Sequence, residues 1–209
     1  QNIDRVLMVG HIERFNPALV ELEKVIKNER IVGIEIQRCS SKDVRIADTD
    51  VIYDLMIHDI DILQNSLLPD NSVISLAAFG KKVYSKNHMD YVQAIMKFDG
   101  DVVSSVVCSR ATENKIRNIN IHCEDAFIET DLLKRTIQIY RKTNLSDYGM
   151  TPTAYKQENL IERIFVPNAE PLRTELEHFY SCVVGEKNVK TSAESSIYAL
   201  KTLDSIKEL

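Results

Sequence analysis

The segment 54–65 combines side chains that can move protons with an apolar background. Read as an α-helix at about 100° per residue, it places four polar side chains in one narrow stripe. These are Asp54, His58, Asp61 and Asn65. Apolar residues fill most of the remaining circumference, which is typical of a buried helix. Because unpaired buried charge is costly, the stripe must face a partner, a cavity or a ligand.

Asp54 and His58 are one helical turn apart, so the carboxylate could accept a hydrogen bond from the imidazole and fix its tautomer. A histidine held in this way is a candidate general base with a pKa near the working pH. Two other interpretations remain open at this point. The pair could be structural, sealing the helix against its neighbours. Alternatively, Asp54, His58 and Asp61 could hold a divalent metal ion, although the two-histidine spacing of helical zinc sites is absent.

Composition narrows the possible classes of function. The chain has 209 residues, of which 44% are hydrophobic, and its formal net charge is −5. It has no basic cluster and no apolar run long enough to span a bilayer, so nothing points to nucleic acid or to a membrane. The 4 cysteines are scattered and form no C-x-x-C pair, which is typical of reduced thiols in a cytoplasmic protein.

The elements that must position the stripe can be read from capping and alternation signals. Asn16 followed by Pro17 predicts a helix that continues to about Asn28, and a strand is expected over 31–37. Further strands are expected over 73–79, 91–98, 102–109, 115–123, 126–131, 135–140 and 161–166. The order helix, strand, helix, many strands, two helices predicts an α+β fold, an open, mostly antiparallel sheet with helices packed on one face.

Two helices are expected at the carboxyl end. Pro171 starts the first of them and Gly185 ends it. The run Thr-Ser-Ala-Glu at 191–194 matches a capping box, so Thr191 is expected to cap the final helix. The apolar positions of this final helix are Ile197, Leu200, Leu203 and Ile206.

The amino end resembles the continuation of another domain. Val6 to Val9 is an apolar run of strand length that ends at Gly10, and a buried strand seldom begins a domain. We therefore expect this chain to be the carboxyl part of a longer protein. The stretch 143–157 has no clear period and predicts a long loop near a site or an interface.

Several of these segments resemble, in the same order, parts of the glucose–fructose oxidoreductase and inositol dehydrogenase family. The segment 10–17, Gly-His-Ile-Glu-Arg-Phe-Asn-Pro, resembles the one that follows the dinucleotide-binding domain in that family. The pattern Asp54-x-x-x-His58-Asp59-x-Asp61 resembles the family's catalytic helix. The pattern continues through 91–98, the Asp99-Gly100 turn, Lys115-x-Arg117 and Pro171-Leu172-x-x-Glu175-Leu176-x-x-Phe179.

The resemblance implies a reaction and roles for individual residues. His58 would take the proton from a sugar hydroxyl while a hydride leaves the same carbon for the nicotinamide of NAD or NADP. Asp54 would orient His58 and bind substrate hydroxyls. Arg14 and Asn16 would lie where two domains meet, near the cofactor and the substrate.

Other roles follow less directly from the resemblance. Asp61 and Tyr155 are further candidates for binding substrate. Asp61 and Asn65 could equally hold the helix through hydrogen bonds. Arg117 is expected to form a structural ion pair within the sheet rather than to touch substrate.

The family's Gly-rich fingerprint and its Glu-Lys-Pro motif are absent from this sequence. The resemblance therefore implies that residues 1–12 are the last strand of an upstream dinucleotide-binding domain, which mainly binds the NAD or NADP. It also implies that residues 13–209 form a substrate-binding and oligomerisation domain, and that residues 1–209 alone are inactive. The segments 10–17 and 57–61 are most similar to those of members that act on nucleotide sugars. The expected substrate is a sugar or nucleotide sugar.

The resemblance also implies a homodimer or homotetramer that forms through the open face of the sheet. Two alternating sets could place apolar side chains on that face, namely Val103 with Val107, and Ile119 with Ile121 and Cys123. Two alternatives to the dehydrogenase stay open. One is a non-enzymatic dimerisation or sugar-binding module, and the other is a metal-dependent hydrolase that uses Asp54, His58 and Asp61.

Overall fold

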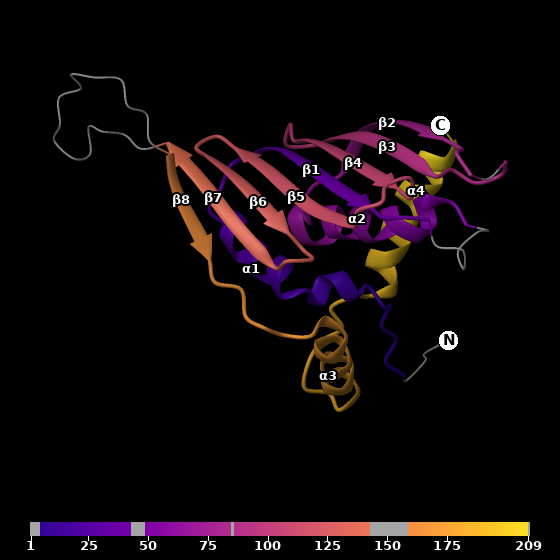
Figure 1. Ribbon diagram of the computed structural model, residues 1–209. Helices are drawn as coiled ribbons and strands as arrows, with labels where there is room; N and C mark the ends of the chain where they lie inside the picture. The colour runs from indigo at the N-terminus through magenta and orange to yellow at the C-terminus, as the bar shows by residue number, and fades with distance from the viewer. Residues whose placement is uncertain (1–4, 43–48, 85, 143–158, 209) are drawn as a thin grey trace, which may run out of the picture.

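The computed structural model describes residues 5–42, 49–84, 86–142 and 159–208. The strands are β1 (Ile31–Cys39), β2 (Val73–Lys81), β3 (Tyr91–Phe98), β4 (Val103–Ser109), β5 (Ile116–Cys123), β6 (Ala126–Asp131), β7 (Thr136–Lys142) and β8 (Asn159–Ile164). The α-helices are α1 (Pro17–Ile26), α2 (Ile57–Ile62), α3 (Pro171–Val183) and α4 (Ala193–Glu208). Shorter helical segments are η1 (Ile12–Phe15), η2 (Ile52–Met56) and η3 (Leu63–Leu67). The strands form one sheet, the helices gather on one side of it, and α3 stands away from it (Figure 1).

The strand order in the sheet is β2-β3-β4-β1-β5-β6-β7-β8. Every neighbouring pair is antiparallel except β1 and β4, which run parallel with Gly33 opposite Val103. Antiparallel neighbours can be joined by hairpins, but a parallel pair needs a crossover. The crossover here contains η2, α2 and η3, and η2 packs against β4. The fold class predicted from the sequence is therefore confirmed, and the candidate helix lies beneath the centre of the sheet.

The core lies between the sheet and the helices. Successive side chains of a strand point to opposite faces, so the buried positions alternate. Ile34 and Ile36 of β1 and Ile119 and Ile121 of β5 are buried, as is Val106 of β4. The helices contribute Leu19, Leu22, Met56, Ile60, Leu63, Ala199, Leu203 and Ile206. Of the two sets considered for the open face, Ile119 and Ile121 thus belong to the covered face.

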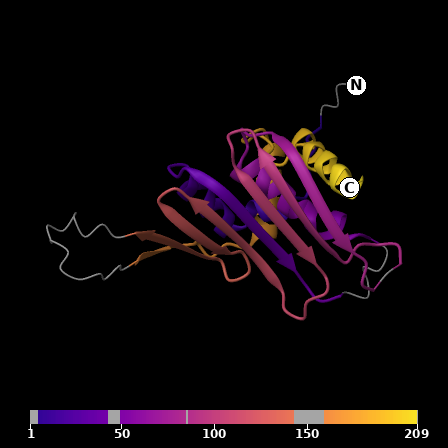
Figure 2. The same ribbon diagram turned by 90° about the horizontal axis from the view of Figure 1, so that it is seen from above.

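None of the described helices lies on the other face of the sheet, as the view from above shows (Figure 2). Exposed apolar side chains lie on the strands at one end of the sheet, including Phe79, Tyr91, Ile95 and Val103. The strands β5, β6 and β7 instead present polar residues, among them Asn118, Asn120, Glu129 and Gln138. The assembly of a homodimer or homotetramer through this face stays a prediction. We expect the contact at the end of the sheet that carries these exposed apolar side chains.

The amino-terminal segment differs from its expectation. Among the described residues, the segment Val6 to Val9 forms no strand, because no described strand pairs with it through backbone hydrogen bonds. Instead the Val9 amide donates to the Thr191 carbonyl at 3.0 Å, and the Thr191 hydroxyl donates to the Val9 carbonyl at 2.6 Å. Since Thr191 is engaged in this way, Ser192 caps α4, and its hydroxyl accepts from the Ser195 amide at 3.2 Å. The expected Thr191 cap is wrong by one residue.

The helix signals were otherwise accurate near the amino end and less so in α4. Asn16 caps α1 as predicted, with its side-chain oxygen accepting from the Ala18 amide at 3.1 Å. In α4 the expected apolar set is only half correct, because Ile197 is 51% exposed and Leu200 43% exposed.

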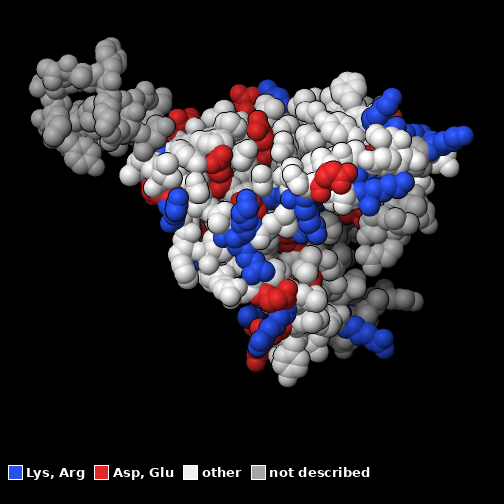
Figure 3. Space-filling model, in the orientation of Figure 1, with Lys and Arg blue, Asp and Glu red and all other residues white. Residues whose placement is uncertain are grey.

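Acidic and basic side chains are interspersed over the surface seen in Figure 3. No helix among the described residues has both the length and the apolar character needed to cross a membrane.

Candidate functional site

The helix that carries the candidate stripe changes its winding twice. The segments Ile52–Met56 and Leu63–Leu67 are π-helical, and regular α-helix lies between them. The Leu68 amide accordingly donates to the Leu63 carbonyl, five residues back, at 2.9 Å. A π-turn holds more residues than an α-turn and is frequent at functional sites. The single stripe expected at 100° per residue therefore does not persist, and its members contact different partners.

His58 lies half-buried on α2. Its Nδ1 atom is buried and has no hydrogen-bond partner among the described residues. Burial lowers the pKa of His58 to about 4, and the positive charges of Arg38 and Arg117 also lower this pKa. The expected pKa near the working pH is thus wrong, because desolvation and nearby cations disfavour the imidazolium. At pH 7 the imidazole is neutral and able to accept a proton.

Asp54 does not orient His58 in this structure. Its carboxylate lies 3.6 Å from the Arg110 guanidinium, which also donates to the Thr49 carbonyl at 2.6 Å. Within the described residues no hydrogen bond joins Asp54 to His58. The cause is the wide turn at η2 together with the competing cation beyond the end of β4. Contact between Asp54 and substrate hydroxyls stays a prediction, since this side chain is 24% exposed.

Asp61 and Asn65 hold the helix against its neighbours. The Asp61 carboxylate is 1% exposed, and it lies 3.8 Å from His11 Nδ1 and 3.9 Å from Arg14 Nη1. It also accepts a hydrogen bond from the Asn65 amide at 2.9 Å. Burial raises the pKa of Asp61, and His11 and Arg14 oppose the rise. Asp61 therefore has almost no exposed surface with which to bind a substrate, and the structural alternative describes it better.

Arg14 and Asn16 are both buried against the domain itself. The Asn16 side-chain amide donates to the Leu132 carbonyl at 3.1 Å and to Glu13 at 3.2 Å, beside its capping bond. These three hydrogen bonds hold the Asn16 side chain within the domain. Arg14 Nη1 donates to the Ser195 hydroxyl at 3.5 Å, while its Nε is buried without a partner in the described chain. A role in binding cofactor or substrate stays a prediction for both, with Arg14 the freer of the two.

The sequence analysis did not identify a buried ionic network beside His58. Glu13 Oε1 accepts from Arg38 Nη1 at 2.9 Å and from Arg117 Nη1 at 2.8 Å. Arg38 Nε also donates to Asp59 Oδ1 at 2.8 Å. Arg117 thus forms an ion pair, as predicted, but the expected partner within the sheet is wrong, because Glu13 belongs to η1. A signal for Arg38 existed, because it follows Ile34 and Ile36 in the buried phase of β1.

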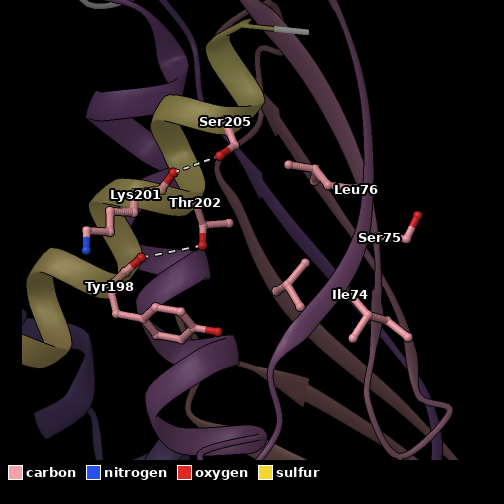
Figure 4. Close-up of a pocket in the computed structure, with 8 residues that line it drawn as sticks. Ile74, Ser75, Leu76, Tyr198, Lys201, Thr202 and Ser205 are labelled. Carbon is pink, nitrogen blue, oxygen red and sulfur yellow. Dashed lines mark hydrogen bonds between the residues drawn. The ribbon is translucent and has the colours of Figure 1, made fainter.

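Tyr155 lies outside the described residues. A cavity of about 310 Å³ lies between β2 and α4, with Ile74, Leu76, Tyr198 and Thr202 in its lining (Figure 4). None of the predicted site residues lines it.

The residues present can be compared with the groups that a metal or a dinucleotide needs. Among the described residues, no group of three His, Cys, Asp or Glu side chains could hold a metal ion. Asp54 and Asp61 face different cations, so the ligand set of the hydrolase alternative is not assembled. The 6 glycines of the chain nowhere follow the Gly-x-Gly spacing of a pyrophosphate cradle. The residues of this chain therefore do not fit a whole dinucleotide.

The geometry defines a class of protein, an open α+β sheet domain with a neutral histidine on a partly π-helical crossover. Comparison with known proteins refines this class. Residues 40–129 match the family model described as the GFO/IDH/MocA C-terminal domain. Over these residues the chain is similar to this family of C-terminal domains, in agreement with the resemblance seen in its sequence.

Individual relatives are similar to this chain over most of its length. The UDP-N-acetylglucosamine 3-dehydrogenase of Acidithiobacillus ferrooxidans is 27% identical over 184 residues, which are 88% of this chain and 56% of that protein. A solved structure of the same enzyme superposes with a TM-score of 0.82 at 24% identity, covering 97% of this chain and 61% of that one. The chain thus spans under two thirds of the length of these relatives.

More distant structures share the fold. A levoglucosan dehydrogenase in complex with NADH and levoglucosan has a TM-score of 0.75 at 16% identity, covering 100% of this chain and 65% of that one. An inositol dehydrogenase homologue from Azotobacter vinelandii, in complex with NADH and myo-inositol, has a TM-score of 0.74 at 12% identity. It covers 98% of this chain and 63% of that one.

Proposed function

We propose that this chain is the substrate-binding and catalytic-base domain of an NAD(P)-dependent sugar dehydrogenase, with His58 as the base. The observation that carries the proposal is the state of the His58 imidazole. It is half-buried, neutral at pH 7, and its Nδ1 has no partner among the described residues. It also lies in the segment whose sequence resembles the catalytic helix of the family.

Oxidation of a secondary alcohol removes a proton from oxygen and a hydride from carbon. The part that this chain supplies is the proton acceptor. A neutral imidazole takes the hydroxyl proton and becomes imidazolium, and the electron pair of the broken O–H bond forms the carbonyl as hydride leaves. Since the chain lacks a pyrophosphate cradle, the proposal concerns only the proton, and a nicotinamide cofactor would accept the hydride.

The low pKa of His58 sets a limit on this chemistry. A base with a pKa of about 4 is always available at pH 7 but has little driving force. The imidazolium formed during turnover lies near Glu13, which raises the pKa of His58. A bound substrate oxygen that accepts a hydrogen bond from the imidazolium would raise this pKa further, whereas the displacement of water by itself would lower it.

A nucleotide sugar is the substrate class that we favour. The support is the curated relative named UDP-N-acetylglucosamine 3-dehydrogenase, which aligns over 88% of this chain. A diphosphate needs cationic partners. The candidates are Arg14, whose buried Nε has no partner among the described residues, and Lys190, whose ammonium donates to the Arg14 carbonyl at 2.7 Å.

The test is turnover by the protein encoded by the complete reading frame. Purified protein is supplied with NAD or NADP and with UDP-N-acetylglucosamine, levoglucosan or myo-inositol, and cofactor reduction is followed by absorbance. We expect His58→Ala to lower kcat by about 10²–10⁴-fold, the usual loss when general-base help is removed. His122→Ala is the matched control, because that imidazole is 49% exposed on β5 and should not matter. Equal turnover in the two variants would remove His58 from its role.

A further inference from the structure

The face of the sheet that carries none of the described helices has a polar half, formed by β5, β6 and β7 (Figure 2). On these strands Ile119, Ile121 and Ile128 are buried in the core. Successive side chains of a strand alternate between the two faces, so the residues next to these isoleucines lie on the face opposite to α2 and His58. A ligand bound there would therefore be separate from the chemistry proposed for His58.

Side chains that oppose one another across these strands form rows, and the first row is aromatic. His122 opposes Phe127, and Phe127 opposes Tyr140. The ring centroids are 4.9 Å apart in the first pair and 6.0 Å apart in the second, so neighbouring rings are in contact. None of these rings is fully buried. The row is thus a partly exposed strip of ring surface.

The next two rows are polar. Asn120, Glu129 and Gln138 oppose one another in the second row. The third row consists of Asn118, Asp131 and Thr136. A hollow of about 240 Å³ lies over both rows, and all of these side chains line it. The aromatic row therefore borders a polar hollow on the same face.

The polar rows have unused hydrogen-bonding groups. The Tyr140 hydroxyl donates to Gln138 Oε1 at 2.9 Å, whereas the Gln138 amide nitrogen donates to none of the described residues. Within the described chain, the side chains of Asn118 and Asn120 likewise make no hydrogen bond. An amide presents a donor beside an acceptor, and the Glu129 carboxylate adds further acceptors. The hollow can therefore receive a ligand that both donates and accepts hydrogen bonds.

The residue types on β5 are unusual for a strand. Asparagine is depleted in strands, because its short polar side chain competes with the backbone for hydrogen bonds. β5 nevertheless carries Asn118 and Asn120 on one face, on either side of the buried Ile119. Choices against local preference are typical of functional sites. These asparagines therefore indicate a role other than stabilising the strand.

We propose that the aromatic row and the polar hollow together form a binding site for a sugar ring, apart from the candidate active site. Adjacent hydroxyls of a sugar ring donate and accept in pairs, which matches the amides of Asn120 and Gln138 beside the Glu129 carboxylate. The C–H groups of the ring would lie against the aromatic row.

A second copy of the chain fits this half of the sheet less well. Charged residues are depleted from the cores of protein interfaces, and here Glu35 of β1 continues the second row beyond Asn120. The exposed apolar side chains lie at the other end of the sheet. The sugar site does not rest on the proposed function, because neither α2 nor His58 contributes to it.

The experiment is an NMR titration of ¹⁵N-labelled residues 1–209 with N-acetylglucosamine, levoglucosan and myo-inositol. We expect the side-chain amide signals of Asn120 and Gln138 to shift saturably with at least one of these compounds. The Gln93 amide is the internal control, because the Tyr91 hydroxyl donates to its Oε1 at 3.4 Å on the same face, outside the rows.

Variants separate this site from other binding. Combining Asn120→Ala with Gln138→Ala should weaken the binding by about tenfold, since a lost hydrogen bond typically costs about 2–10-fold in affinity. Phe127→Leu removes the central ring and should also weaken it several-fold. Gln93→Ala is the matched control and should bind like the unaltered chain. His58→Ala should bind equally well, because His58 lies beneath the other face.

The proposal is overturned if no sugar gives a saturable shift, or if the Gln93 signal follows the same curve as the Gln138 signal. It is also overturned if the double variant or Phe127→Leu binds as tightly as the unaltered chain, or if His58→Ala abolishes the shifts. Sedimentation velocity tests the remaining occupant. If the chain is a dimer that the double variant converts to a monomer, the rows are a contact between copies and the sugar site is wrong.

Discussion

The low pKa of His58 makes a quantitative prediction about acid stability. In the unfolded chain a histidine titrates near 6.5, whereas burial lowers the pKa of folded His58 to about 4. A group whose pKa is depressed on folding contributes stability above its unfolded pKa and loses it as the pH falls towards the folded value. The window for this loss is therefore pH 6.5 to 4.

The size of the effect follows from the separation of the two pKa values. One pKa unit corresponds to 1.36 kcal/mol, so His58 should cost the folded state about 2 kcal/mol at pH 5 and about 3 kcal/mol at pH 4. The assay is urea unfolding followed by circular dichroism at pH 7 and pH 5. We expect the unaltered chain to lose about 2 kcal/mol more than His58→Gln between these two pH values.

Comparing slopes removes the contributions of other groups that titrate in the same range, because both proteins share them. His122→Gln serves as the control, since that side chain is 49% exposed and its loss should leave the slope unchanged. If the unaltered chain and His58→Gln lose stability in parallel between pH 7 and pH 5, the buried, neutral state of His58 is refuted. The proton-accepting role would then have to rest on another group.

Three further predictions concern stability and binding. Arg38→Met should destabilise the domain by about 3–5 kcal/mol in urea unfolding, because it leaves Asp59 as an unpaired buried charge; a loss below 1 kcal/mol would contradict the network. Ser192→Ala should cost about 0.5–2 kcal/mol by removing the cap of α4, whereas an unchanged melting temperature would return the cap to Thr191. Residues 1–209 alone should show no micromolar binding of NAD or NADP by calorimetry, since the chain has no pyrophosphate cradle, and such binding would overturn that reasoning.

The sequence was sufficient to predict the sheet and most of its elements, for identifiable reasons. Alternation of apolar residues marked the strands, and the Asn16-Pro17 pair marked the start of α1. Alternation cannot say which of two faces receives the helices. Val103 and Ile119 therefore looked equivalent until the crossover placed α2 beneath one face, burying Ile119 and leaving Val103 46% exposed.

The details of the candidate site depended on contacts between distant segments. Asp54 and His58 have the right spacing for a regular helix, but the π-helical turn and the presence of Arg110 separate them. The sequence pattern predicts that Thr191 caps α4, but its hydroxyl donates to the Val9 carbonyl instead. Local sequence signals do not include such partners, because competition for a hydrogen-bonding group is decided only after the chain has folded.

The single parallel pair in the sheet has a consequence for how the domain is made. β1 is synthesised before all the other strands, yet its two neighbours, β4 and β5, follow only after the whole crossover has been completed. During synthesis the backbone N–H and C=O groups of β1 therefore stay without strand partners until β4 and β5 have been made. The later hairpins, in contrast, can form as soon as their two adjacent strands are complete. Chains that stop before residue 103 would expose β1 as an unpaired apolar strand that can pair with other chains. Interrupted translation should therefore yield aggregates rather than a smaller stable unit.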